Sequence, residues 1–105
     1  MRITIAHTKS QQEMIETVDR TFEDAFKGLA LGPIEITDQH KAWRGSVMSF
    51  SLTAKLGFLK HPVSGTVEVN DRDVILTADL GRLGKLIPAE KVQAAVKTRL
   101  RGLLT

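Results

Sequence analysis

The chain contains no cysteine among its 105 residues. Disulfide bonds and thiolate metal sites are therefore excluded, and such a composition is typical of a protein in a reducing cytoplasm. The apolar stretch within Met1–His7 is far too short for a signal peptide or for a membrane span, which needs roughly 20 residues. We expect a cytoplasmic protein of one domain, residues 1–105, without a transmembrane segment.

Motifs that carry chemistry are also missing. No G-x-S-x-G segment is present, and Gly81–Lys85 departs from a phosphate loop because two residues, not four, separate its glycines. The histidines His7, His40 and His61 lie on separate segments, without the close spacing typical of zinc ligands. We therefore predict that the protein is not an enzyme, with no catalytic residues, no metal and no cofactor.

Aromatic residues are few: four Phe, one Trp and no Tyr, and the formal net charge is only +3. Nucleic-acid binding usually requires a denser basic face or exposed aromatic rings that stack on bases. We therefore predict no nucleic-acid partner.

Helical patterns are present near both ends of the chain. Ser10 and Glu13 have the spacing of a capping box, and apolar residues follow at helical spacing to Leu29, so we predict a helix over residues 10–30 that Gly32 and Pro33 end. Pro88 suits the first position of a final helix. The apolar stripe of that helix is Val92, Ala95, Val96, Leu100 and Leu103.

Alternating apolar residues predict strands between these helices, after a short first strand at 2–7. The clearest alternation has one apolar face, Met48, Phe50, Leu52, Ala54, Leu56 and Phe58. The polar run at 38–41 predicts a bulge or early turn after Ile34–Thr37, and residues 44–46 predict a turn. Residues 70–73 predict a hairpin turn in which Asp71 and Asp73 make Asx bonds to the backbone of the turn itself.

A sheet with one apolar face needs a cover, and two amphipathic helices supply it. We predict an α+β two-layer sandwich of order β-α-β-β-β-α, in which the helices cover one face of an antiparallel meander.

Several short segments, taken together in order, resemble the small polyhydroxyalkanoic acid system family. They are Ile5-Ala6-His7, Trp43-Arg44-Gly45, Phe50-Ser51-Leu52, Gly65-Thr66-Val67-Glu68-Val69 and Asp79-Leu80. Proteins of this family are encoded near genes for bacterial polyester storage granules. The resemblance implies a bacterial, cytoplasmic, granule-associated accessory protein without enzyme activity, and a reduced version of the helix-grip fold. It assigns no role to His7 or Trp43.

The predicted topology brings the tip of the hairpin at 57–63 and the loop at 81–88 to the same end of the sheet. Large apolar side chains beside bases suit contact with an anionic surface that has an apolar core, such as a granule surface or granule proteins. The candidate contact residues are Phe58, Leu59, Lys60, His61, Arg82, Leu83, Lys85 and Leu86. In the alternative interpretation, these apolar side chains fold back and close the end of the core.

Two further hypotheses concern the faces of the sheet. An acyl or other apolar ligand bound between the sheet and the last helix would contact Met48, Phe50, Leu52, Val92 and Val96. The opposite, polar face suits plain solvent exposure, or pairing of two copies in a homodimer.

Overall fold

The computed structural model describes residues 1–27 and 33–104, without the side chains of residues 26 and 27. It contains five strands and three helices within this part of the chain. In chain order these are β1 (Arg2–Ala6), α1 (Gln11–Lys27), β2 (Ile34–Arg44), β3 (Val47–Leu56), β4 (Leu59–Val69), β5 (Asp73–Asp79), α2 (Leu83–Leu86) and α3 (Ala89–Leu104).

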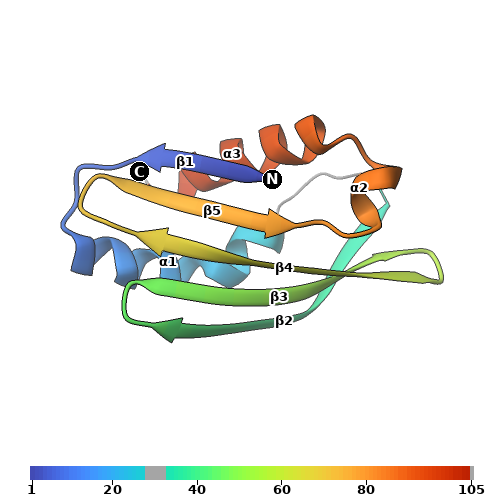
Figure 1. The fold of residues 1–105 in the computed structure, drawn as a ribbon, viewed down its shortest axis with the longest axis horizontal. Helices are drawn as coiled ribbons and strands as arrows, with labels where there is room; N and C mark the ends of the chain where they lie inside the picture. The colour runs from blue at the N-terminus through green and yellow to red at the C-terminus, as the bar shows by residue number, and fades with distance from the viewer. Residues whose placement is uncertain (28–32, 105) are drawn as a thin grey trace.

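The strands form one antiparallel sheet in the order β1-β5-β4-β3-β2. Strands β2 to β5 are a meander, and β1 pairs with β5 at the far edge. Helices α1 and α3 lie on the same face of this sheet (Figure 1). The predicted fold class, an α+β two-layer sandwich, is confirmed.

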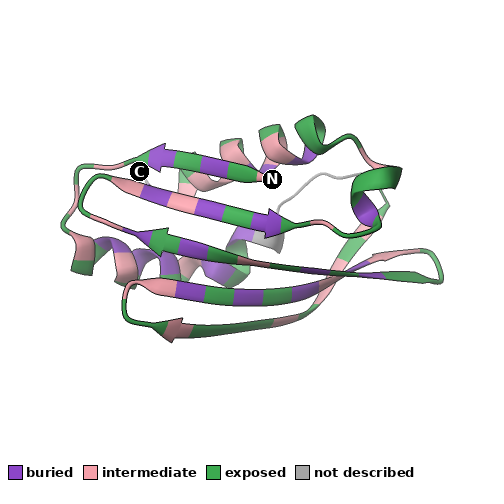
Figure 2. Cartoon of the chain, in the orientation of Figure 1, coloured by how far each residue is buried: buried purple, intermediate pink, exposed green. Residues whose placement is uncertain are grey.

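Burial alternates along the strands, because successive side chains point to opposite faces (Figure 2). The buried face packs against the two helices, and Met14 of α1 and Met48 of β3 are both fully buried in that layer. The other face exposes small polar residues such as Ser49, Ser51 and Thr66, as the sequence pattern predicted.

The element order differs from the prediction in two respects. Four strands follow α1, where the predicted order β-α-β-β-β-α has three, and the short helix α2 precedes α3. The predicted strand through Phe58 ends at Leu56, because Gly57 adopts a φ of +63° and allows a two-residue hairpin loop. Phe58 therefore lies in the loop and is not part of the core face.

Helix α1 begins where the sequence indicated. The Ser10 hydroxyl accepts a hydrogen bond from the Glu13 amide at 3.2 Å and lies 3.1 Å from the Glu13 carboxylate, so half of the capping box forms. Leu29 and the predicted stop at Gly32 fall outside the described residues.

The predicted bulge lies inside β2. The β2–β3 register shifts between Thr37 and His40, and Asp38 has a φ of +53°, a conformation that Asp tolerates better than most residues. Since β2 is an edge strand, this bulge makes pairing with another chain less favourable.

The turn between β4 and β5 forms, but with different bonds from those predicted. Asn70 is the residue whose side chain accepts hydrogen bonds from the amides of Arg72 and Asp73, at 2.8 and 2.7 Å. Asp71 instead accepts a bond from the Gln11 amide at the start of α1.

Candidate functional site

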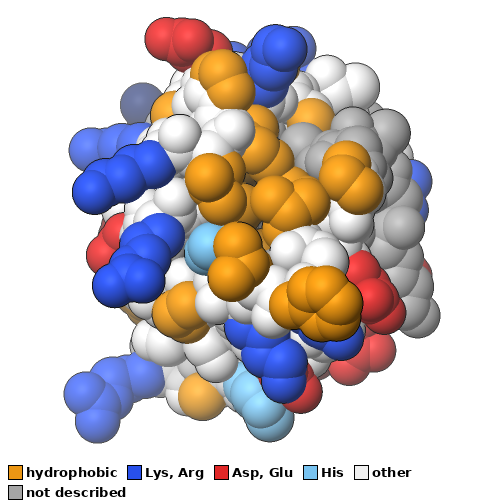
Figure 3. All heavy atoms as spheres, turned by 90° about the vertical axis from the view of Figure 1, so that its right-hand side faces the viewer, with side chains coloured by type: hydrophobic (Ala, Val, Ile, Leu, Met, Phe, Trp, Pro, Cys, Tyr) orange, Lys and Arg blue, Asp and Glu red, His pale blue; other side chains and the backbone are white. Residues whose placement is uncertain are grey.

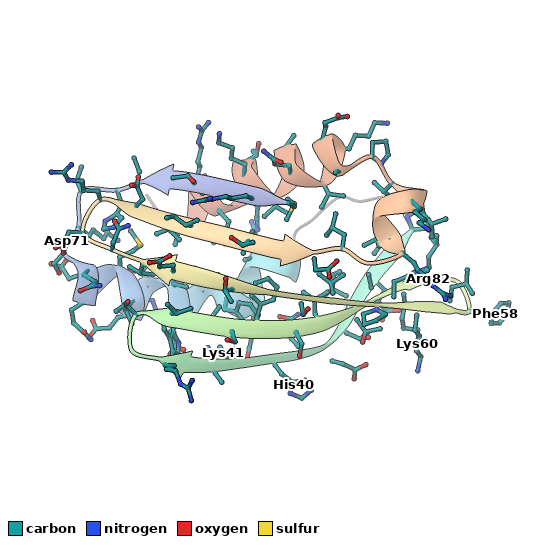
Figure 4. All side chains as sticks on the ribbon, in the orientation of Figure 1. His40, Lys41, Phe58, Lys60, Asp71 and Arg82 are labelled. Atoms are coloured by element: carbon teal, nitrogen blue, oxygen red, sulfur yellow. The ribbon has the colours of Figure 1, made fainter. Side chains whose placement is uncertain are left out.

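The hairpin tip and the α2 segment lie at one end of the molecule, as the topology predicted. The last pair between β4 and β5 is Ser64 with Asp79, and a side chain added at Gly81 would come within 3.4 Å of the Pro62 carbonyl oxygen. Figure 4 shows Phe58, Lys60 and Arg82 together at this end, far from Asp71. We call residues 53–62 and 80–88 the hairpin end.

Three large hydrophobic side chains are exposed in the part of the chain that the structure describes, and all three belong to the hairpin end. Phe58 is 104% exposed, Leu59 is 59% exposed and Leu86 is 51% exposed. Figure 3 shows hydrophobic side chains gathered on this side of the molecule, with both basic and acidic side chains around them. For these residues, the interpretation that apolar side chains fold back into the core is wrong.

Two of the candidate contact residues are buried. His61 is 6% exposed, because strand alternation places it on the same face as the buried Val63. Leu83 is 3% exposed and belongs to the core, since α2 turns this side chain inward while Leu86 points out. The candidate contact surface therefore consists of Phe58, Leu59, Lys60, Arg82, Lys85 and Leu86.

The charges of the hairpin end have one sign. Its residues include four bases, Lys55, Lys60, Arg82 and Lys85, and no Asp or Glu. None of these bases has an ion-pair partner among the described residues. Four bases without an ion pair among the described residues thus lie at the same end of the molecule as the apolar tip.

The five residues of the predicted ligand lining are all buried in the core between the sheet and the helices. Phe50, Leu52, Val92 and Val96 line one hollow of about 40 Å³, and Met48 lines a second of about 30 Å³, which Val96 also borders. Small-molecule sites usually enclose roughly 300–1,000 Å³. Both hollows are far smaller than such sites. They are gaps in the packing of the core and do not form a preformed acyl pocket.

The structure gives His7 and Trp43 contacts that the sequence did not reveal. The His7 ring nitrogen Nε2 lies 2.7 Å from the Asn70 carbonyl oxygen and so ties the end of β1 to the β4–β5 turn. The Trp43 indole donates to the Asp19 carboxylate at 2.8 Å, and Lys41 forms an ion pair with the same carboxylate at 3.0 Å. These bonds fasten edge strand β2 to helix α1.

Hydrogen bonds from Lys41 and then from Trp43 hold the pKa of Asp19 below its ordinary value. A carboxyl group with a lowered folded pKa stabilises the fold above its unfolded pKa of about 3.9, and this contribution disappears as the pH falls through the folded pKa. Asp19→Asn should therefore lower the free energy of unfolding at pH 7, by less than about 1 kcal/mol because the pair is at the surface. The difference from the parent protein should shrink below about pH 4.

Urea denaturation at pH 7 and at a pH below the Asp19 pKa measures this difference. Glu68→Gln, on the exposed face of the sheet, is the matched control for loss of one carboxylate and should change the free energy of unfolding at pH 7 by less than about 0.5 kcal/mol. If the cost of Asp19→Asn were the same at both pH values, Asp19 would not stabilise the protein through its charge.

No family model, no curated protein and no solved structure matches this chain. Within residues 1–27 and 33–104, no three His, Cys, Asp or Glu side chains lie close enough to hold a metal ion. No described helix is long and apolar enough to cross a membrane.

Proposed function

We propose that this protein is a non-enzymatic accessory protein of bacterial polyhydroxyalkanoate metabolism that attaches to the surface of the polyester storage granule through its hairpin end. The sequence resemblance described above supports the granule setting. The surface of the molecule supports the mode of action, because the exposed apolar residues suit attachment to a hydrophobic particle.

The observation that carries this proposal is the position of Phe58. Its side chain is fully exposed at the outermost point of the hairpin. Leu59, the next residue in the chain, is also exposed, and Leu86 is exposed on α2 at the same end of the molecule. Isolated exposed apolar residues are common, but a group of large ones at one place is typical of a contact site. Full burial of each would contribute roughly 1.5–3 kcal/mol.

Fractionation of granule-forming bacterial cells that express the protein tests the proposal. We expect the protein to sediment with the granules, and the Phe58→Ser variant to shift toward the supernatant. Ala94→Ser, at an exposed position of α3, is the control and should stay with the granules. Recovery of the parent protein in the granule-free supernatant would contradict the proposal.

The alternative function, binding of an acyl ligand between the sheet and α3, has weaker support. The hollow beside Val92 and Val96 is about 40 Å³, so a ligand would have to separate packed side chains in order to enter. Homodimer formation through the polar face of the sheet stays a prediction.

A further inference from the structure

The hairpin end has a shape suited to shallow insertion into a surface layer. Residues 59–63 of β4 pair with β3 but extend beyond the last β4–β5 pair, Ser64 with Asp79. At roughly 3.3 Å per residue, the hairpin projects about 16 Å past that pair. Gly57 begins the two-residue loop, and a side chain added there would meet nothing within 4 Å, so the tip is sterically free.

Two lysines of the hairpin are arranged so that their charges repel each other in the isolated protein. Lys55 and Lys60 are directly opposite each other in the β3–β4 register, and like charges in this arrangement destabilise a sheet. Glu35 faces Lys55 from β2, but the described strands place no acid opposite Lys60. A negatively charged partner would relieve this repulsion.

Arg82 and Lys85 add two exposed bases from the α2 segment, and Figure 4 shows Arg82 beside the hairpin. Asp79, just before this segment, uses its carboxylate to accept a hydrogen bond from the Gly81 amide at 2.9 Å. A neutral polyester surface would interact with Phe58 and Leu59 but would leave these cations without counter-charges. A layer of anionic lipid headgroups over acyl chains would satisfy both groups, because apolar side chains enter the acyl boundary while bases stay among the phosphates.

We propose that the hairpin end docks on an anionic phospholipid layer, with Phe58 and Leu59 inserted at the acyl boundary and with Lys60, Arg82 and Lys85 among the headgroup phosphates. This inference rests on the proposed function, since it names the chemistry of the granule coat that the hairpin end contacts. It predicts that the protein binds lipid layers that contain no polyester.

Co-sedimentation of the full chain with lipid vesicles tests this inference. We expect binding to vesicles of equimolar phosphatidylglycerol and phosphatidylcholine, and at least about tenfold weaker binding to phosphatidylcholine alone. Lys60→Glu with Lys85→Glu should weaken binding to the mixed vesicles by about tenfold or more at low salt. The loss should be smaller at high salt, because the Debye length falls from about 30 Å at 0.01 M to about 10 Å at 0.1 M.

Arg44→Glu with Arg72→Glu is the control, because it changes the net charge equally at exposed positions near the opposite end of the sheet. This control pair should bind mixed vesicles nearly as well as the parent protein. Equal losses for the two pairs, or equal binding to both kinds of vesicle, would overturn the docking mode.

Bare polyester particles separate this inference from the proposed function. Binding to bare particles but not to anionic vesicles would overturn the lipid inference and leave the granule proposal standing. Binding to anionic vesicles without granule association in cells would support the lipid inference and contradict the proposed function. Binding to none of these surfaces would contradict both.

Discussion

Gly65→Ala should destabilise the protein by about 3 kcal/mol, the upper part of the usual range for overpacking a core. Gly65 lies in β4 between Phe50 of β3 and Ala78 of β5. A Cβ atom there would collide with the Thr77 carbonyl oxygen and would lie 2.9 Å from both the Ala78 Cα and the Phe50 ring. Because two of these atoms are backbone, the strands would have to separate.

Gly102→Ala is the matched control for this prediction. Gly102 lies in α3, where an added Cβ would meet nothing within 4 Å, and alanine favours a helix by up to about 1 kcal/mol over glycine. Urea denaturation should therefore move the two midpoints in opposite directions. Equal shifts would mean that Phe50 and β5 do not pack over Gly65 as described.

Leu83→Ala should cost roughly 2–5 kcal/mol of folding stability, whereas Leu86→Ala should change it by less than about 0.5 kcal/mol. Both residues belong to α2, but Leu83 is 3% exposed and Leu86 is 51% exposed. The same truncation therefore leaves a cavity at one position and removes a solvent-facing side chain at the other. Thermal or urea denaturation of the two variants measures the contrast.

A reversed order of stability would place Leu86 in the core and would remove it from the contact surface. Equal large costs would show that the whole α2 segment closes the core, as the alternative interpretation of the sequence held. Either result would leave Phe58 and Leu59 as the exposed apolar residues of the hairpin end.

The parts of the fold that the sequence predicted depend on local patterns. Alternation from Met48 to Leu56 places one face of β3 in the core, and the polar run after Thr37 indicates the bulge in β2. Connectivity alone then brings the hairpin tip and the 81–88 loop to the same end. These features follow from backbone geometry, which the local pattern of a single sequence predicts well.

The errors at the hairpin end arise where local patterns are short. The alternation through Val63 indicates that His61 faces the core. The prediction of a surface position follows instead from the polar side chain of His61 and from the basic residue beside it, Lys60. Helix α2 has four residues, which is too short for a helical period to show that Leu83 is buried. Gly57 was the available sign that the strand ends before Phe58.

Contacts between distant segments were not predictable from one sequence. Asp19 and Trp43 are 24 residues apart, and their hydrogen bond depends on how α1 packs against β2. The same is true of His7 and Asn70, which are 63 residues apart. Side chains of these types bond in many ways, so their partners follow only from the assembled fold.

Co-sedimentation of the double variant Leu59→Ser with Leu86→Ser on isolated polyester granules, measured together with its stability, tests the granule-binding account most directly. Each leucine contributes roughly 1.5–3 kcal/mol when fully buried, and about 1.4 kcal/mol is a tenfold change in affinity. We therefore predict that granule binding falls at least about tenfold while the free energy of unfolding changes by less than about 1 kcal/mol. Undiminished granule binding by the folded double variant, or a loss that only follows unfolding, would contradict attachment through the hairpin end.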